Sequence, residues 1–165
     1  MFYHLDFYSD EELTRIIKNS AERMGIEIDA EAALAIASRS RGTPRIANRL
    51  LRRVRDYVQV ESLKRIDRQA VEKSLEALRI DKGGLDEIDR KVLRTLIEVY
   101  NGGPAGIESL SAHLNEETDT IVDCIEPYLL KAGYLKRTSR GRVVTELAYK
   151  HLNIPYKSEQ QRELF

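Results

Sequence analysis

Residues 41–56 read RGTPRIANRLLRRVRD, and this stretch carries the clearest helix signal in the chain. Gly42 interrupts regular secondary structure. Thr43 then suits the N-cap position, and Pro44 suits the first position of a helix. Apolar residues then recur at helical spacing along one face, at Ile46, Leu50, Leu51, Val54 and Val58. The stretch therefore predicts an amphipathic helix to about residue 58 that packs by this face onto other elements.

Three further helices are predicted around this one, each from its own start signal. Ser9 opens a capping box, because a glutamate follows three residues later. Asp29 and Asp67 are suitable N-caps for the other two helices, which also have apolar residues at helical spacing. Residues 1–8 are interpreted as a short strand or an extended connector. Residues 1–80 are therefore expected to form a four-helix bundle.

The second half of the chain has a different order of elements. The glycine-rich stretch 81–85 is expected to be a linker between two domains. Three helical segments follow, and then two extended segments on either side of Ser139-Arg140-Gly141, which is a hairpin signal. This order predicts a winged helix-turn-helix domain over residues 86–152, with a small β-hairpin as its wing. The polar residues 153–165 are expected to be a disordered tail, so the fold class is mainly α.

The composition predicts a cytoplasmic protein that does not contact a membrane. Lysine and arginine total 27, aspartate and glutamate also total 27, and the formal net charge is zero. Cys124 is the only cysteine, which excludes a disulfide framework within the chain, and the three histidines have no metal-ligand spacing. No apolar run approaches the roughly 20 residues of a membrane span.

The charge is distributed unevenly along the chain. Residues 39–68 hold ten basic side chains against three acidic ones, and residues 131–150 hold six against one. Residues 107–130 hold six acidic side chains and no basic one. Because the third helix of the winged domain is acidic, phosphates would repel it from a DNA groove. We therefore expect the hairpin to contact the DNA backbone without sequence preference, through three arginines: Arg137, Arg140 and Arg142.

Arg45 is a candidate for a phosphate contact. A cation in the first turn of a helix is unfavourable by about 0.3–1 kcal/mol. An anion docked there would reverse this, because the helix dipole, the free backbone N–H groups and the guanidinium would all favour it. The alternatives are a solvated arginine or an ion pair with a nearby carboxylate. Further arginines on the same helical face either line an interface or a nucleotide cleft, or are solvated: Arg49, Arg52 and Arg53.

The stretch 41–56 resembles the RuvB family. Further blocks that resemble this family, in the same order, are Asp89-Arg90-Lys91, Gly102-Gly103-Pro104, Glu126-Pro127-Tyr128-Leu129 and Arg137-Thr138-Ser139-Arg140-Gly141-Arg142. The resemblance implies an AAA+ ATPase that forms hexameric rings around DNA and drives Holliday junction branch migration, in recombination and repair, together with RuvA. It implies that residues 1–80 are the small lid domain of that ATPase.

The resemblance also implies roles for individual residues. Arg45 would be the sensor-2 arginine that detects the γ-phosphate of ATP, and Tyr8 would lie against the nucleotide with Pro44. The wing arginines would contact a four-way junction or duplex DNA, as the charge distribution also predicts.

The chain departs from the family because the phosphate loop, the acidic Mg²⁺ motif, the arginine finger and the RuvA-docking hairpin have no counterpart in it. It therefore reads as the C-terminal fragment of a helicase or translocase. We expect no catalytic residue and no metal site in it, no ATP hydrolysis by it alone, and a role for ATP with Mg²⁺ only in the full-length protein.

Two alternatives and one further motif accompany this interpretation. The chain could be a self-standing winged-helix DNA-binding regulator whose bundle dimerises, or part of an origin-recognition AAA+ protein, which shares the layout but not the blocks. The tail sequence Gln161–Phe165 loosely resembles peptides that dock on the bacterial sliding clamp.

Overall fold

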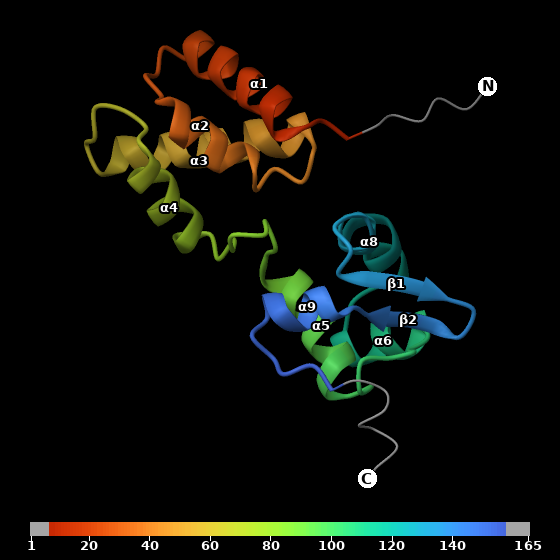
Figure 1. The fold of residues 1–165 in the computed structure, drawn as a ribbon. Coiled ribbons are helices and arrows are strands. Elements are labelled where there is room, and N and C mark those ends of the chain that lie inside the picture. The colour runs from red at the N-terminus through yellow and green to blue at the C-terminus, as the bar shows by residue number, and fades with distance from the viewer. Residues whose placement is uncertain (1–6, 158–165) are drawn as a thin grey trace, which may run out of the picture. The chain divides into compact units, whose positions relative to one another are not determined.

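The computed structural model describes residues 7–157 and divides the chain into two units between Asp86 and Glu87. The first unit contains the predicted bundle of four helices (Figure 1). The helices are α1 (Asp10–Arg23), α2 (Ala30–Ala37), α3 (Pro44–Val60) and α4 (Arg68–Ala77). Of the stretch expected to be a strand or connector, residues 1–6 lie outside the described residues, and residues 7 and 8 are in neither helix nor strand.

Side-chain caps fix where three of these helices begin. Ser9 and Glu12 form the predicted capping box, in which each side chain accepts a hydrogen bond from the other residue's backbone N–H. Asp29 and Asp67 accept from the third residue of α2 and α4, at 2.7 Å and 2.8 Å. An isolated bridge between Ile28 and Ile66 also joins the segments that lead into α2 and α4.

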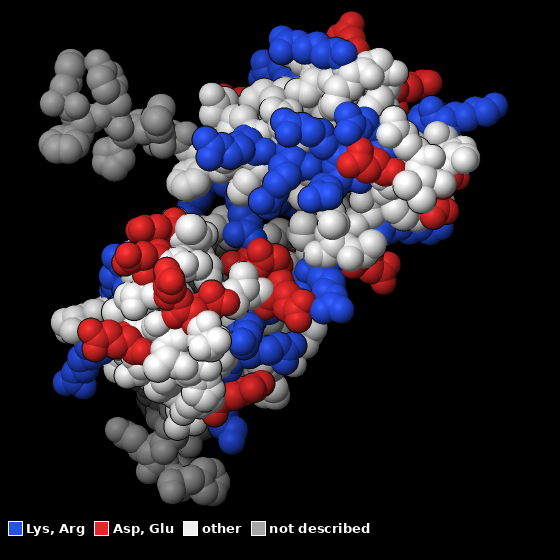
Figure 2. Space-filling model, turned by 180° about the vertical axis from the view of Figure 1, so that it is seen from behind, with Lys and Arg blue, Asp and Glu red and all other residues white. Residues whose placement is uncertain are grey.

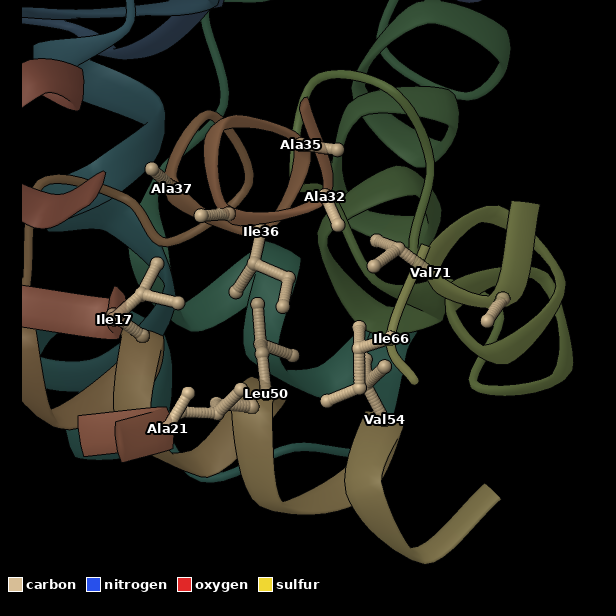
Figure 3. Close-up of a cluster of buried hydrophobic side chains, with 14 of the residues drawn as sticks. Ile17, Ala21, Ala32, Ala35, Ile36, Ala37, Leu50, Val54, Ile66 and Val71 are labelled. Carbon is tan, nitrogen blue, oxygen red and sulfur yellow. The ribbon is translucent and has the colours of Figure 1, made fainter. Parts of the chain in front are cut away.

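The apolar faces of the four helices meet in one core (Figure 3). Ile36 of α2 points toward Leu50 of α3, and Val54 lies beside Ile66. The stripe predicted on α3 is buried from Leu50 to Val58, whereas Ile46 is only partly buried. The core therefore fixes which side of α3 faces outward, and the arginines of α3 lie on that side.

The second unit has the predicted winged-helix order. Its first helices are α5 (Glu87–Glu98) and α6 (Ile107–Leu114), and its third helical segment runs from Thr118 to Lys131. Strands β1 (Leu135–Thr138) and β2 (Gly141–Val144) form the antiparallel wing, and α9 (Glu146–His151) follows. The predicted fold class is confirmed in both units.

The third helical segment is less regular than predicted. It consists of α7 (Thr118–Thr120), a π-helical turn η1 (Ile121–Ile125) and α8 (Glu126–Lys131). Within it, Glu126 donates its backbone N–H to the carbonyl of Ile121, five residues back. Pro127 explains the wider turn, because proline has no N–H and its ring would clash with the carbonyl four residues earlier. A π-helical turn contains one residue more than an α-helical turn, so the side chains that follow it are rotated by about 100° around the helix axis. Glu126, directly after this turn, is buried.

Replacing Ile36 by alanine should destabilise the first unit by about 2–5 kcal/mol, because it leaves a cavity in the core. Leu34 of the same helix is the matched control, since its side chain is 49% exposed whereas that of Ile36 is 0% exposed. Leu34→Ala should cost well under half as much. Urea unfolding followed by circular dichroism measures both, and equal costs would contradict the packing described.

Candidate functional sites

The turn between α2 and α3 brings together the residues predicted to contact a nucleotide. Arg41 and Gly42 have positive φ values of 56° and 68°, which reverse the chain before Pro44 starts α3. The backbone N–H of Tyr8 donates to the carbonyl of Gly42 at 2.9 Å. Gly42 lies two residues before Pro44 and three before Arg45. This hydrogen bond therefore anchors the backbone of Tyr8, which is far away in sequence, just before the start of α3.

At the N-terminus of α3, no side chain caps the backbone N–H groups and no carboxylate pairs with the charge of Arg45 among the described residues. Thr43 occupies the N-cap position as predicted, but its hydroxyl makes no capping bond and instead donates to the carbonyl of Arg41 at 3.3 Å. Arg45 is exposed and has no ion-pair or hydrogen-bond partner within residues 7–157. The alternative of an ion pair for Arg45 is therefore not realised among the described side chains.

The other arginines of the predicted row are in the same state as Arg45. Arg49, Arg52 and Arg53 are exposed, and none has a carboxylate partner in the described part of the chain. Figure 2 shows Lys and Arg side chains gathered on one face of the first unit, with little acidic surface among them. This face of α3 therefore presents uncompensated positive charge.

The same turn also holds the segment that was predicted to be a linker. Arg41 donates from Nε to the carbonyl of Gly84 at 3.1 Å and lies 3.8 Å from the carboxylate of Asp86. Gly84 has a φ of +75°, and a Cβ there would lie 3.0 Å from the carbonyl oxygen of Arg39. Asp81 accepts from two backbone N–H groups of the segment, at 2.9 Å and 3.0 Å. Residues 81–86 thus form a turn fastened to the first unit.

In the second unit, the wing is supported by a third extended segment. Ala105 and Arg142 exchange both backbone hydrogen bonds, at 3.0 Å and 2.8 Å. Two glycines permit this close approach. A Cβ on Gly141 would lie 2.3 Å from the carbonyl oxygen of Ala105, and one on Gly103 would lie 2.3 Å from that of Arg142. The Gly-Gly-Pro block and the hairpin block therefore depend on each other.

The structure separates the three wing arginines that the sequence grouped together. Arg137 and Arg142 face each other across the hairpin, and both pair with the buried carboxylate of Glu126. Arg142 is turned inward, with only 13% of its side chain exposed, whereas Arg137 remains 50% exposed. Arg140, at the tip of the turn, is exposed and has no side-chain partner among residues 7–157. Arg142 is therefore less accessible to a ligand than Arg137 and Arg140, and contact of these three arginines with DNA stays a prediction.

Sequence reasoning missed the role of Glu126. It was counted with the acidic surface of residues 107–130, but its side chain is only 1% exposed and lies against the wing. The one local signal was Pro127, which disturbs the helical register just before it. Its two partners come from strands whose position relative to the helix is not encoded in local spacing.

Other candidate features are limited to a few observations. Cys124 is exposed. Among residues 7–157, no three histidine, cysteine or acidic side chains gather as they would around a metal ion. Within the same residues, no helix combines the length and apolarity that crossing a bilayer requires. The sequence Gln161–Phe165, predicted to resemble clamp-binding peptides, lies outside the described residues.

Fold and site together define a class of protein: an AAA+ lid domain followed by a winged-helix domain. A family model described as RuvB AAA lid domain matches residues 8–81, and one described as RuvB C-terminal winged helix domain matches residues 82–153. The chain belongs to the RuvB family. The alternatives of a self-standing regulator and of an origin-recognition protein are not what these matches indicate.

Curated relatives and solved structures agree with this assignment. The Holliday junction branch migration complex subunit RuvB of Ligilactobacillus salivarius is 52% identical over 156 residues, which are 94% of this chain and 46% of the relative. The protein of the same name from Dehalococcoides mccartyi is 52% identical over 161 residues, or 98% of this chain and 46% of the relative. The chain thus spans about half the length of these relatives.

Among solved structures, the Thermotoga maritima RuvB Holliday junction branch migration motor superposes with a TM-score of 0.90. It is 55% identical, and the match covers 93% of this chain and 51% of that one.

Gly141→Ala should destabilise the second unit by roughly 3 kcal/mol or more, because a φ of 134° is strained for alanine and the new Cβ would meet the carbonyl of Ala105. Gly106→Ala is the control, since nothing lies within 4 Å of a Cβ there, and it should cost about 1 kcal/mol at most. Thermal unfolding of both variants tests this. A tolerated alanine at 141 would show that the third segment does not press on the wing.

Proposed function

We propose that this chain is the lid and winged-helix part of an ATP-driven motor that moves Holliday junctions. Membership of the RuvB family over residues 8–153 is the observation that carries this proposal. In the whole motor, the phosphate loop, the Mg²⁺ site and the RuvA-docking surface would belong to the part of the relatives that this chain does not match. The motor would form a hexameric ring, would need ATP with Mg²⁺, and would act in the cytoplasm.

The lid would read the state of the nucleotide through Arg45. Its guanidinium, the uncapped first turn of α3 and the helix dipole together favour a phosphate at this position. Tyr8, held on Gly42, and Pro44 would lie beside the bound nucleotide. Bound ATP supplies the γ-phosphate, which is lost on hydrolysis. Because Arg41 of the same turn holds Gly84 and Asp86, a displacement of this turn would also displace the segment leading to the second unit.

The wing would contact DNA through phosphates rather than bases. Arg140 at the hairpin tip is free, and Arg137 is half exposed, so both could reach a DNA backbone. Five of the six acidic residues between 107 and 130 remain at least partly exposed, so the acidic helix would still be repelled from a groove. This supports binding of four-way junctions or duplexes without a sequence code.

Arg140→Gln should weaken binding of duplex DNA by about fivefold and lower the slope of log K against log salt by about one phosphate contact. The matched control is Lys150→Gln, which removes the same charge from α9, where Lys150 already pairs with Glu146. It should leave the slope unchanged. Fluorescence anisotropy with two unrelated duplexes at several salt concentrations gives both values. Much tighter binding to one of the duplexes would contradict binding without a sequence code, and an unchanged slope for Arg140→Gln would contradict the contact proposed for Arg140.

Arg45→Ala should reduce ATP turnover roughly tenfold or more in a motor that carries this chain in place of the matching half of the Ligilactobacillus salivarius relative. Arg52→Ala, on the same face two turns along α3, should stay within about twofold of the unsubstituted motor. The chain alone should show no turnover. Equal losses at both positions, or clear hydrolysis by the isolated chain, would argue against the proposed roles.

A further inference from the structure

We propose that Glu126 is a positioning residue of the wing: its buried carboxylate makes Arg142 a structural support and holds Arg137 ready for a DNA phosphate. The inference rests on the proposed contact between the wing and DNA. It adds a residue to that site that carries the opposite charge to the one expected at a DNA surface.

The geometry is that of one carboxylate shared by two arginines. Oε1 of Glu126 accepts from Nε of Arg142 at 2.5 Å, and Oε2 accepts from a terminal nitrogen of Arg142 at 3.4 Å. Oε2 also accepts from a terminal nitrogen of Arg137 at 2.5 Å. Arg142 therefore donates to Glu126 from two of its three side-chain nitrogens, whereas Arg137 donates from one.

The carboxylate is needed because the two arginines are direct cross-strand partners. Like charges directly opposite each other destabilise a pair of strands, and Arg137 and Arg142 occupy such positions in the register. Glu126 neutralises one of the two charges and leaves a net charge of one at this cross-strand pair, the second from the turn of the hairpin. Since Arg142 is 13% exposed and Arg137 is 50% exposed, the remaining charge is available at Arg137.

The orientation of Arg137 follows from the same contact. A guanidinium has five N–H donors in a planar fork, and only one terminal nitrogen of Arg137 is engaged by Glu126. The rest of the fork is fixed in direction while its side chain stays half exposed. A phosphate arriving at the wing would therefore meet a guanidinium that has already lost much of its rotational freedom. Arg140, without a partner, would have to be ordered by the DNA itself.

The proposal predicts an effect opposite in sign to that of simple electrostatics. Glu126→Gln removes a negative charge close to the DNA, so charge alone predicts tighter binding. If Glu126 positions Arg137, the same substitution should weaken binding, because the two arginines would repel each other and Arg137 would lose its fixed direction. The sign of the change in affinity therefore separates the two accounts.

The test uses the chain described here, with fluorescence anisotropy on a duplex over a range of salt concentrations. Glu126→Gln should weaken binding about threefold or more and lower the salt slope by about one phosphate contact. Arg137→Gln should do the same, and the double variant should be no weaker than Arg137→Gln alone. Asp123→Asn is the matched control, because Asp123 lies on the same helical segment, is exposed, and has no partner in residues 7–157. It should bind as well as the unsubstituted chain or slightly better.

If Glu126→Gln binds as Asp123→Asn does, the inference is overturned. If thermal unfolding shows that Glu126→Gln is not folded, the salt slopes of Arg137→Gln and Arg142→Gln decide the question instead. A salt slope lowered by one phosphate contact in Arg137→Gln but not in Arg142→Gln supports the role proposed for Glu126, and any other pattern overturns it. The proposed contact between the wing and DNA fails separately: it is contradicted if neither Arg137→Gln nor Arg140→Gln weakens binding, whatever Glu126→Gln does.

Discussion

The pairing of guanidinium groups with carboxylates determines which of the positive charges in this chain can act on a ligand. The formal net charge is zero, yet the arginines differ in burial and in pairing. Arg39 and Arg142 are turned inward onto Glu72 and Glu126, where they hold helices and strands together. Arg45 and Arg140 have no such partner among the described residues, and they lie at the start of α3 and at the tip of the wing. A buried arginine left without its carboxylate would be costly, by several kcal/mol, so the inward pairs stabilise the fold, whereas Arg45 and Arg140 stay available for the proposed contacts.

The lid is organised around a single turn, at Arg41 and Gly42. This turn accepts the backbone N–H of Tyr8, leads into α3 with its exposed Arg45, and fastens Gly84 through the side chain of Arg41. The proposed nucleotide contact at α3 and the segment toward the second unit thus depend on the same turn. The stretch 41–56 is distinctive in the sequence because its residues must form a helix start, a reversal of the chain and a long-range contact at once.

Local signals predicted most of the elements, and the resemblance of the sequence blocks identified the family, but neither predicted the contacts between elements. Caps, apolar spacing and the hairpin turn predicted the four lid helices and the wing, because these depend on residues within a few positions of each other. The support of the wing by Ala105, the clamp of Arg41 on Gly84 and the burial of Glu126 join residues that are far apart in sequence. The π-helical turn before Pro127 had a local cause, yet the periodicity of an unbroken helix concealed it. The charges along the sequence could not distinguish Arg142 from Arg137, because they do not show which ionised side chains are buried.

We propose different ligands for the two basic regions of the chain: a nucleotide phosphate at Arg45, at the start of α3, and DNA at the wing. Side-chain NMR of the arginine Nε–H groups, recorded while duplex DNA is added, tests this division most directly. The signals of Arg137 and Arg140 should shift with increasing DNA, while those of Arg142 and of the α3 arginines stay in place. Shifts confined to Arg45, Arg49, Arg52 and Arg53, with the wing unchanged, would contradict it.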